Sequence, residues 1–323
     1  MPNDVQEKVD EKVLGRFESL IRRERLAHAY LLIGSEGSGT CETAFAVAKL
    51  LNCESLGSTF CGRCASCVKI DSGHHPDILL CDSGDDQTIK IQQVREVIQR
   101  MQLCPYEARK KVVIIKDVDR LTTEGANALL KTLEEPPASS LLFLTTAVPE
   151  RVMPTVKSRC HAVYFFGASR WALVSQLHQD LGMAEDQAGV IAGFAEGCYG
   201  QAGRLHSKGF LKHKNAVIDE FLFDGVSEAS LKAVASDPQQ IEEILRILLF
   251  YFKDLLLLKA GAPEGGLTHS DRIQDLRTCA ARYSIGQLRE ILSGIVNTKK
   301  MSDANLNVRI PLMVLKEKIW ITH

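Results

Sequence analysis

Short apolar runs alternate with amphipathic segments along the first half of the chain. The runs that predict buried strands cover residues 29–33, 78–80, 112–115, 141–145 and 162–165. Between them, apolar positions recur at helical spacing over 13–21, 43–51, 92–101 and 123–134, and the last segment ends before Pro136, as a helix must. Strands that alternate with helices predict an α/β fold, a parallel sheet with helices on both faces.

The second half of the chain has a different pattern. From about residue 168 the strand-like runs disappear, and long amphipathic segments follow one another with glycines at the breaks. The most apolar stretch, 244–258, contains Arg246, Lys253 and Asp254 and is shorter than the ~20 apolar residues that a membrane helix needs. It therefore predicts a buried helix, and the whole half is expected to be all-helical, in two pieces.

Composition and charge exclude several classes of protein. The 323 residues are 45% hydrophobic and 24% charged, which are ordinary globular proportions and exclude wholesale disorder. The net charge of -1 excludes a generally basic coat, so any contact with nucleic acid must use a local patch. The acidic N-terminus has no apolar signal-peptide core, which predicts a cytoplasmic protein with no membrane partner.

A glycine loop follows the first predicted strand. Residues 34–41 fit the frame of the phosphate loop G-x-x-x-x-G-K-[ST], with Gly34, Gly37 and Gly39 in place, but its last two positions hold Thr40 and Cys41. In a working loop the lysine contacts the β- and γ-phosphates and the hydroxyl binds Mg²⁺. Thr40 carries no charge, and the soft thiol of Cys41 is a poor ligand for Mg²⁺. We therefore interpret residues 34–39 as a turn between a strand and a helix rather than as a nucleotide site.

The second metal-holding position of such ATPases is also altered. After the strand 112–115, the place of the Mg²⁺-binding acid is taken by Lys116, and only the next residue, Asp117, is acidic. A shift of register would bring Asp117 or Asp119 to that place, and the sequence leaves this open. We expect a degenerate site with no tightly bound functional ATP.

Four of the ten cysteines lie close together. Cys53, Cys61, Cys64 and Cys67 have the spacing C-x7-C-x2-C-x2-C, and four thiolates complete the tetrahedron of a closed structural zinc site. An iron–sulfur cluster is the alternative, although Asp71 stands where a ferredoxin motif would continue with cysteine. We expect one structural zinc ion.

Several motifs occur together between residues 25 and 160. They are the R-L-A-H-A-Y run at 25–30, the glycine loop, the four cysteines, G-H-H-P-D at 73–77, I-K-I-Q-Q-V-R-E at 89–96, N-A-L-L-K-T-L-E-E-P-P at 127–137 and P-T-V-K-S-R-C at 154–160. In this combination the sequence resembles the delta-prime subunits of the bacterial DNA polymerase III clamp loader, which are AAA+ proteins.

The resemblance implies an architecture and a set of partners. It implies an AAA+ module over 1–167 with a zinc-binding insertion at about 53–67, a helical lid over 168–208 and a helical collar over 209–323, through which five subunits assemble. The implied partners are motor subunits of the tau/gamma type, a delta subunit, the sliding clamp through the complex, and primed DNA.

The same resemblance implies that the chain does not hydrolyse ATP. Delta-prime subunits characteristically lose the ATPase residues, and Gly200 here stands where active relatives carry an ATP-sensing arginine, with Arg204 close by. The alternative is an active motor-type ATPase, which Mg²⁺-dependent turnover by the purified chain would reveal.

Three further site expectations follow from the resemblance. Arg159 of the S-R-C motif is expected to be an arginine finger that reaches the terminal phosphate of ATP on the adjacent motor subunit; the alternative is an ordinary surface arginine. Lys90 and Arg95, near the start of a helix, could contact phosphates of primed DNA, or the helix could simply be solvated. Lys131, Glu134 and Glu135 could face a neighbouring subunit.

Overall fold

The computed structural model describes residues 9–55, 59–84, 88–227, 231, 234–304 and 306–320. The chain forms two compact units, which are considered separately. The first contains residues 1–168 together with 198–201, and the second contains 169–197 together with 202–323.

The first unit is built on a parallel sheet of five strands in the order β2-β3-β4-β1-β5. The strands are β1 (Ala29–Ile33), β2 (Ile78–Cys81), β3 (Lys111–Ile115), β4 (Ser140–Thr146) and β5 (His161–Tyr164). The central strands are buried along their whole length, which explains why most of their residues are apolar and do not alternate with polar ones. Because all strands are parallel, the loops that follow β1 and β3 lie at the same edge of the sheet.

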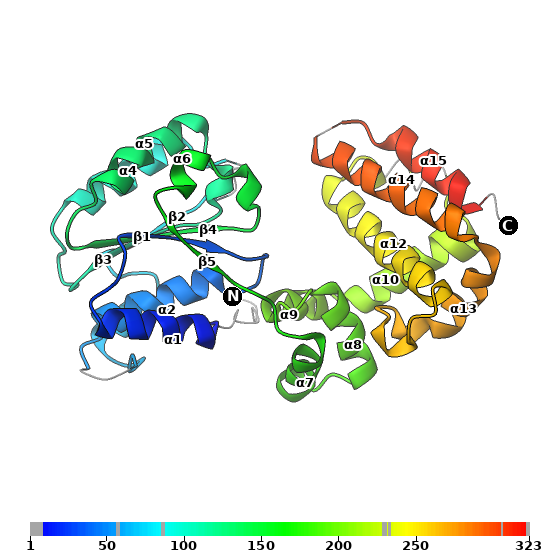
Figure 1. The fold of residues 1–323 in the computed structure, drawn as a ribbon, viewed down its shortest axis with the longest axis horizontal. Helices are drawn as coiled ribbons and strands as arrows, with labels where there is room; N and C mark the ends of the chain where they lie inside the picture. Colours follow the sequence, from blue (N-terminus) through cyan, green and yellow to red (C-terminus); the bar gives the residue numbers. More distant parts are fainter. Residues whose placement is uncertain are drawn as a thin grey trace. The chain divides into compact units, whose positions relative to one another are not determined.

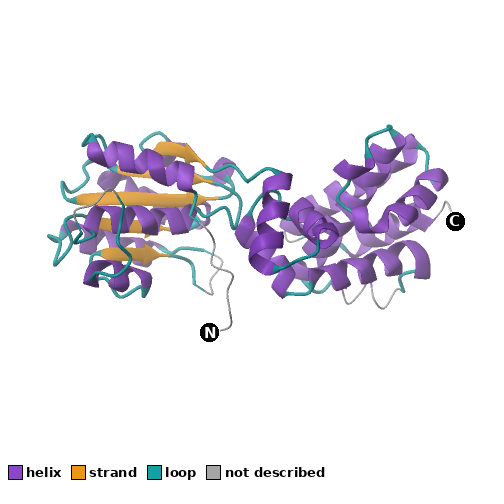
Figure 2. Ribbon diagram, turned by 90° about the horizontal axis from the view of Figure 1, so that it is seen from below, coloured by secondary structure: helices purple, strands orange, loops and turns teal. Residues whose placement is uncertain are grey.

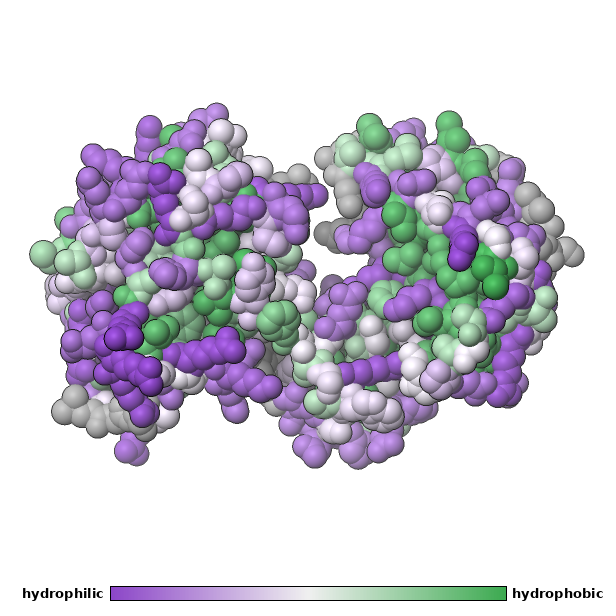
Figure 3. Space-filling view, in the orientation of Figure 1, coloured by the Kyte–Doolittle hydropathy of each residue, from purple (hydrophilic) through white to green (hydrophobic). Residues whose placement is uncertain are grey.

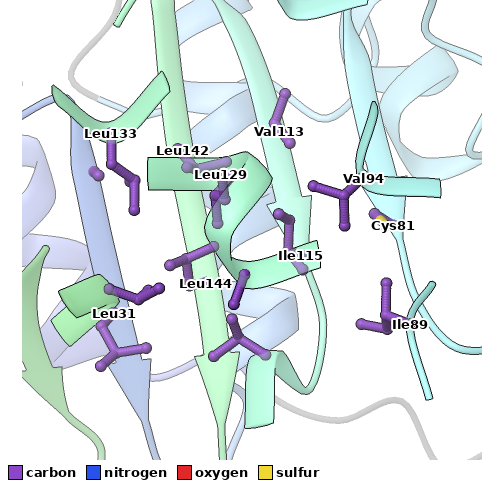
Figure 4. Packing of buried hydrophobic residues seen from close by; sticks show 14 of the residues in the cluster. Leu31, Cys81, Ile89, Val94, Val113, Ile115, Leu129, Leu133, Leu142 and Leu144 are labelled. Carbon is purple, nitrogen blue, oxygen red and sulfur yellow. The ribbon is translucent and has the colours of Figure 1, made fainter. Parts of the chain in front are cut away.

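Helices cover both faces of this sheet (Figures 1 and 2). One face packs against α1 (Glu11–Arg22) and α2 (Thr40–Asn52), with Phe17 and Phe143 in edge-to-face contact at 5.6 Å. The other face packs against α4 (Ile91–Gln102), α5 (Thr123–Glu134) and the short α6 (Pro154–Lys157). Figure 4 shows Leu129 and Leu133 of α5 over Leu142 and Leu144 of β4.

Local signals explain where these helices begin and end. Asp10 caps α1 by accepting the amides of Lys12 and Val13 at 3.0 Å, and Thr122 caps α5 by accepting the amide of Gly125. The helix α3 (Ala65–Asp71) follows the last cysteine gap and is capped by Cys64, whose sulfur accepts the amide of Cys67.

The second unit is all-helical among its described residues. It contains α7 (Arg170–Leu181), α8 (Glu185–Phe194), most of α9 (Tyr199–Ser207), α10 (Phe210–Asp219) with the π-helical turn Glu220–Asp224, α12 (Pro238–Lys259), α13 (Ile273–Arg282), α14 (Ile285–Asp303) and α15 (Arg309–Trp320), with short 3-10 turns at Glu264–Gly266 and Ser270–Arg272. The predicted helix 244–258 lies within α12, whose Leu248, Tyr251 and Leu255 are fully buried. In the space-filling view of Figure 3, polar residues cover much of the visible face and apolar residues form separate patches.

The predicted fold class is therefore confirmed: a parallel α/β unit is followed by a helical region. The division of that region into a lid and a collar at residue 208 stays a prediction. Across the described parts of the chain, none of the helices is both long and apolar enough to span a membrane.

Candidate functional site

The glycine loop connects β1 to α2 at the carboxyl edge of the sheet. Gly39 caps α2 in the left-handed conformation with φ 81°, and Gly37 is also left-handed with φ 82°. Within the loop the amide of Ser38 donates to the carbonyl of Ser35 at 3.0 Å. This amide is thus engaged inside the loop, whereas in a phosphate loop the backbone amides point to the phosphates.

A second contact ties the loop to a distant part of the chain. The hydroxyl of Ser35 lies 2.9 Å from the sulfur of Cys198, which belongs to the same compact unit although it is 163 positions away. Cys198 is buried and directly precedes α9, in which Gly200 occupies the second position. The sequence did not predict this contact.

Asp117 and Asp119, which follow β3, each form a hydrogen bond with a threonine of β4. Lys116 is exposed, and Asp117 has a left-handed φ of 53° while its amide donates to the hydroxyl of Thr145 at 3.2 Å. The carboxylate of Asp119 accepts a 2.6 Å hydrogen bond from the hydroxyl of Thr146. Burial raises the pKa of Asp117, and although the charge of Lys116 opposes the effect, the net shift is upward. Asp119 thus has a hydrogen-bond partner in the sheet, and the carboxylate of Asp117 lies 3.9 Å from Nε of Arg120.

The four predicted metal ligands are brought together. The sulfur atoms of Cys53, Cys61, Cys64 and Cys67 all lie within 4.8 Å of one another, and those of Cys53 and Cys64 are 4.0 Å apart. Sulfurs bound at about 2.3 Å around one tetrahedral ion would be roughly 3.8 Å apart, so the cluster fits a single ion. A polynuclear iron–sulfur cluster places several irons between its thiolates and needs a wider separation.

Backbone amides support the same cluster. The amide of Cys61 donates to the sulfur of Cys53 at 3.3 Å, and the amides of Cys64 and Cys67 donate to the preceding cysteine sulfurs at 3.3 and 3.4 Å. The side chain of Ser55 and nearby amides lower the pKa of Cys61 to about 6, whereas burial raises the pKa of Cys67 to about 12. The donor set, four thiols with amide hydrogen bonds, suits a soft metal ion.

Arg159 lies between α6 and β5 and is about one-third exposed. Its Nε donates to Oε1 of Glu134 at 2.8 Å, and its Nη1 donates to the carbonyl of Thr155 at 3.0 Å. Next to it, burial raises the pKa of the Cys160 thiol to about 12. The guanidinium is therefore on the surface and held in a defined orientation by α5 and α6.

Lys90 directly precedes α4 and Arg95 lies in its second turn. The amide of Lys90 donates to the side chain of Gln93 at 2.8 Å. Both Lys90 and Arg95 are exposed. Neither residue is one of the four clustered cysteines or one of the residues that Arg159 contacts through the hydrogen bonds given above, so they form a separate, weaker candidate.

Asp77, part of the G-H-H-P-D motif, proves to be a buried anchor. Its carboxylate accepts the amides of Tyr106, Glu107 and Ala108, each at 2.9 Å, and lies 3.7 Å from Nζ of Lys111. Glu107 in turn pairs with Lys69 of α3 at 2.6 Å. This chain of contacts connects the cysteine insertion to the edge of the sheet, and sequence spacing did not reveal it.

Two family models match most of the chain. A model described as "DNA polymerase III, delta subunit" matches residues 9–168, and one described as "DNA polymerase III, delta subunit, C terminal" matches residues 208–316.

Curated relatives agree with these models. The delta' subunit of DNA polymerase III from Bacillus subtilis (strain 168) is 27% identical over 308 residues, covering 92% of each chain. The delta' subunit from Escherichia coli (strain K12) is 35% identical over 175 residues, covering 53% of this chain and 52% of the relative. The tau subunit of Bacillus subtilis (strain 168) is 27% identical over 293 residues, covering 82% of this chain but only 52% of tau.

The resemblance seen in the sequence is thus confirmed over both halves of the molecule. The chain belongs to the delta'/tau family of DNA polymerase III clamp-loader subunits.

Proposed function

We propose that this chain is a delta-prime-type subunit that does not hydrolyse ATP and that activates a neighbouring motor subunit by supplying Arg159 in trans. In this role it works with tau/gamma-type motor subunits and a delta subunit to load the sliding clamp onto primed DNA during replication. The observation that carries the proposal is the glycine loop. It keeps the glycines of a phosphate loop but lacks the lysine and the Ser/Thr hydroxyl that bind phosphate and Mg²⁺.

The loop supports the non-hydrolysing part of the proposal. Thr40 and Cys41 replace the lysine and the hydroxyl, and the Ser38 amide is engaged with Ser35 at 3.0 Å. A hydrogen bond to a charged group contributes about 1.5–3 kcal/mol, so the missing ammonium alone weakens phosphate binding roughly tenfold to a hundredfold. The exposed cation Lys116 at the first metal position opposes Mg²⁺ as well.

Arg159 supports the activating part. A guanidinium is always charged and presents a planar fork that matches phosphate oxygens. Here it is on the surface, with its orientation fixed by Glu134 and Thr155. An arginine supplied in trans to a phosphoryl-transfer site can raise turnover by about 10³–10⁵-fold.

A groove in the second unit supports assembly with other subunits. A cavity of about 250 Å³ lies between α14 and α15, and its lining is mostly apolar. At its rim, Ile310 is 71% exposed and Val314 is 46% exposed. Exposed apolar side chains that border a groove are typical of protein contact sites.

For the cysteine cluster we propose one structural zinc ion. All four positions of a tetrahedron are filled by Cys53, Cys61, Cys64 and Cys67, so no position is left for a catalytic water. Zinc there would stabilise the insertion that Asp77 and Glu107 connect to the sheet. Lys90 and Arg95 remain proposed phosphate contacts to primed DNA, since both residues are exposed and lie within the N-terminal half of α4 or directly before it.

The test of the function is reconstitution with a tau/gamma-type subunit, a delta subunit, the clamp and primed DNA. We expect no ATP turnover by the chain alone and DNA-stimulated turnover by the complex. Arg159→Ala should lower that turnover at least tenfold while the complex still assembles on a sizing column. Unchanged turnover with Arg159→Ala would refute the finger, and Mg²⁺-dependent turnover by the isolated chain would favour a motor-type ATPase instead.

A further inference from the structure

Arg159 has almost all of its hydrogen-bond donors engaged within its own chain. Nε and Nη2 donate to the same oxygen of Glu134, at 2.8 and 2.5 Å. Nη1 donates to the carbonyl of Thr155 at 3.0 Å and to the hydroxyl of Ser158 at 3.3 Å. Of the five N–H groups that a guanidinium carries, four are therefore occupied.

The position of Glu134 determines which face of the arginine is available. An arginine binds an anion most strongly through two neighbouring N–H groups that form a fork. In Arg159, the Nε–Nη2 fork is the edge that Glu134 occupies, whereas Thr155 and Ser158 contact the opposite side. A phosphate that approached this edge would have to replace the carboxylate.

Two features make this replacement easy. The side chain of Glu134 is 53% exposed, so its carboxylate can be hydrated once it leaves the arginine. Glu134 is also the last residue of α5, where the negative end of the helix dipole disfavours a carboxylate. The ion pair is thus exchangeable, and helix stability does not explain an acidic residue at this position.

We propose that Glu134 is a positioning residue that holds the fork of Arg159 until the terminal phosphate of a nucleotide on the neighbouring subunit displaces it. The inference rests on the proposed finger role of Arg159 and deepens it, since it makes the finger respond to what the neighbour has bound. With a triphosphate in place, the phosphate outcompetes Glu134; with a diphosphate, Arg159 stays paired within its own chain.

The test compares Glu134→Gln with the native chain in binding to a tau/gamma-type subunit. Titrations are run with a non-hydrolysable ATP analogue and with ADP, each with Mg²⁺. An exposed ion pair has a strength that corresponds to a factor of about 1.5 to 5 in affinity. We expect Glu134→Gln to lower the apparent Kd by that factor with the ATP analogue and to leave it unchanged with ADP, because a purely structural role would shift both equally.

The chain offers a matched control in its second unit. Arg277 donates through Nε and Nη2 to one oxygen of Glu264, at 2.9 and 2.6 Å, and both side chains are about half exposed. Glu264→Gln removes a pair of the same geometry and should change neither titration. Thermal unfolding of both variants should stay within about 4 °C of that of the native chain.

Combining Glu134→Gln with Arg159→Ala separates the positioning role of Glu134 from the finger role of Arg159 on which it rests. In an Arg159→Ala chain, Glu134→Gln should have no effect on binding with the ATP analogue. If Arg159→Ala weakens binding or turnover but Glu134→Gln behaves as the native chain or binds more weakly, the positioning role is overturned and the finger stands. If Arg159→Ala changes nothing, both are overturned.

Discussion

Replacing Asp77 should destabilise the edge of the sheet that supports the cysteine insertion. The side chain of Asp77 is 2% exposed and accepts three backbone amides at 2.9 Å, with Lys111 at 3.7 Å. Asp77→Ala removes the acceptor of these three amides and leaves the buried side chain of Lys111 without its carboxylate. Removing one partner from a buried, hydrogen-bonded charge pair costs about 3–5 kcal/mol. At roughly 2–4 °C per kcal/mol for a unit of this size, we expect the melting temperature of the first unit to fall by about 6–20 °C.

The pH dependence of stability tests whether the charge of Asp77, rather than the size and shape of its side chain, is responsible. Burial alone would raise the pKa of this carboxyl, but the amides of Glu107, Tyr106 and Ala108 together with Lys111 outweigh it, and the net shift is downward. Because the pKa of Asp77 is lower in the folded than in the unfolded chain, its charge stabilises the fold. This stabilisation is fully present above the unfolded-state pKa of about 3.9 and is lost as the pH falls through the lower folded-state pKa. The stability advantage of the native chain over Asp77→Asn should therefore be constant near neutral pH and shrink below about pH 4.

Hydrogen exchange gives a local measurement of the same change. The amides of Tyr106, Glu107 and Ala108 should exchange faster in Asp77→Ala than in the native chain, with a smaller effect in Asp77→Asn, which keeps one acceptor oxygen. Amides of the second unit serve as an internal control and should not change. Unchanged protection of these three amides, or a native advantage over Asp77→Asn that is the same at pH 7 and pH 3, would refute the reasoning.

Two further predictions concern the metal cluster and the glycine loop. The purified chain should contain about one zinc per molecule by elemental analysis, and Cys64→Ser should lose most of it, because a closed structural site needs all four ligands; zinc retained at full stoichiometry in Cys64→Ser would contradict the site. Restoring the loop with the double substitution Thr40→Lys and Cys41→Thr should leave ATP turnover at background in a coupled assay, since Lys116 still occupies the first metal position; turnover well above that of the native chain would show that the loop alone is at fault.

The sequence predicted best the buried strands and the helix that ends shortly before Pro136. The segments 29–33 and 123–134 coincide with β1 and α5, and the remaining strands are within one residue at each end. Central strands buried on both faces are apolar at most positions, and this gives a clear signal. The helix α3 was not predicted because it is only seven residues long and its start depends on the sulfur of Cys64.

The candidate sites also differ in how far they could be predicted from the sequence. The cysteine cluster could be predicted because two of its gaps span only two residues, so local spacing already brings the sulfurs together. The contact between Ser35 and Cys198 joins positions 163 apart, and that between Arg159 and Glu134 joins positions 25 apart on different elements. Such pairs depend on how the sheet and its helices are connected, and no spacing rule contains that information.

The glycines of the loop have a physical explanation that requires no phosphate. A Cβ on Gly34 would lie 2.4 Å from the hydroxyl of Ser38 and 2.8 Å from Cβ of Phe165, and Gly39 needs its left-handed φ to start α2. Both glycines are thus required for the turn between β1 and α2, whatever the loop binds. Thr40 and Cys41 occupy the first turn of α2, where many side chains fit the same backbone. A chain can therefore lose the lysine and hydroxyl of a phosphate loop at little cost to folding while it keeps the glycine frame, and this is the combination found here.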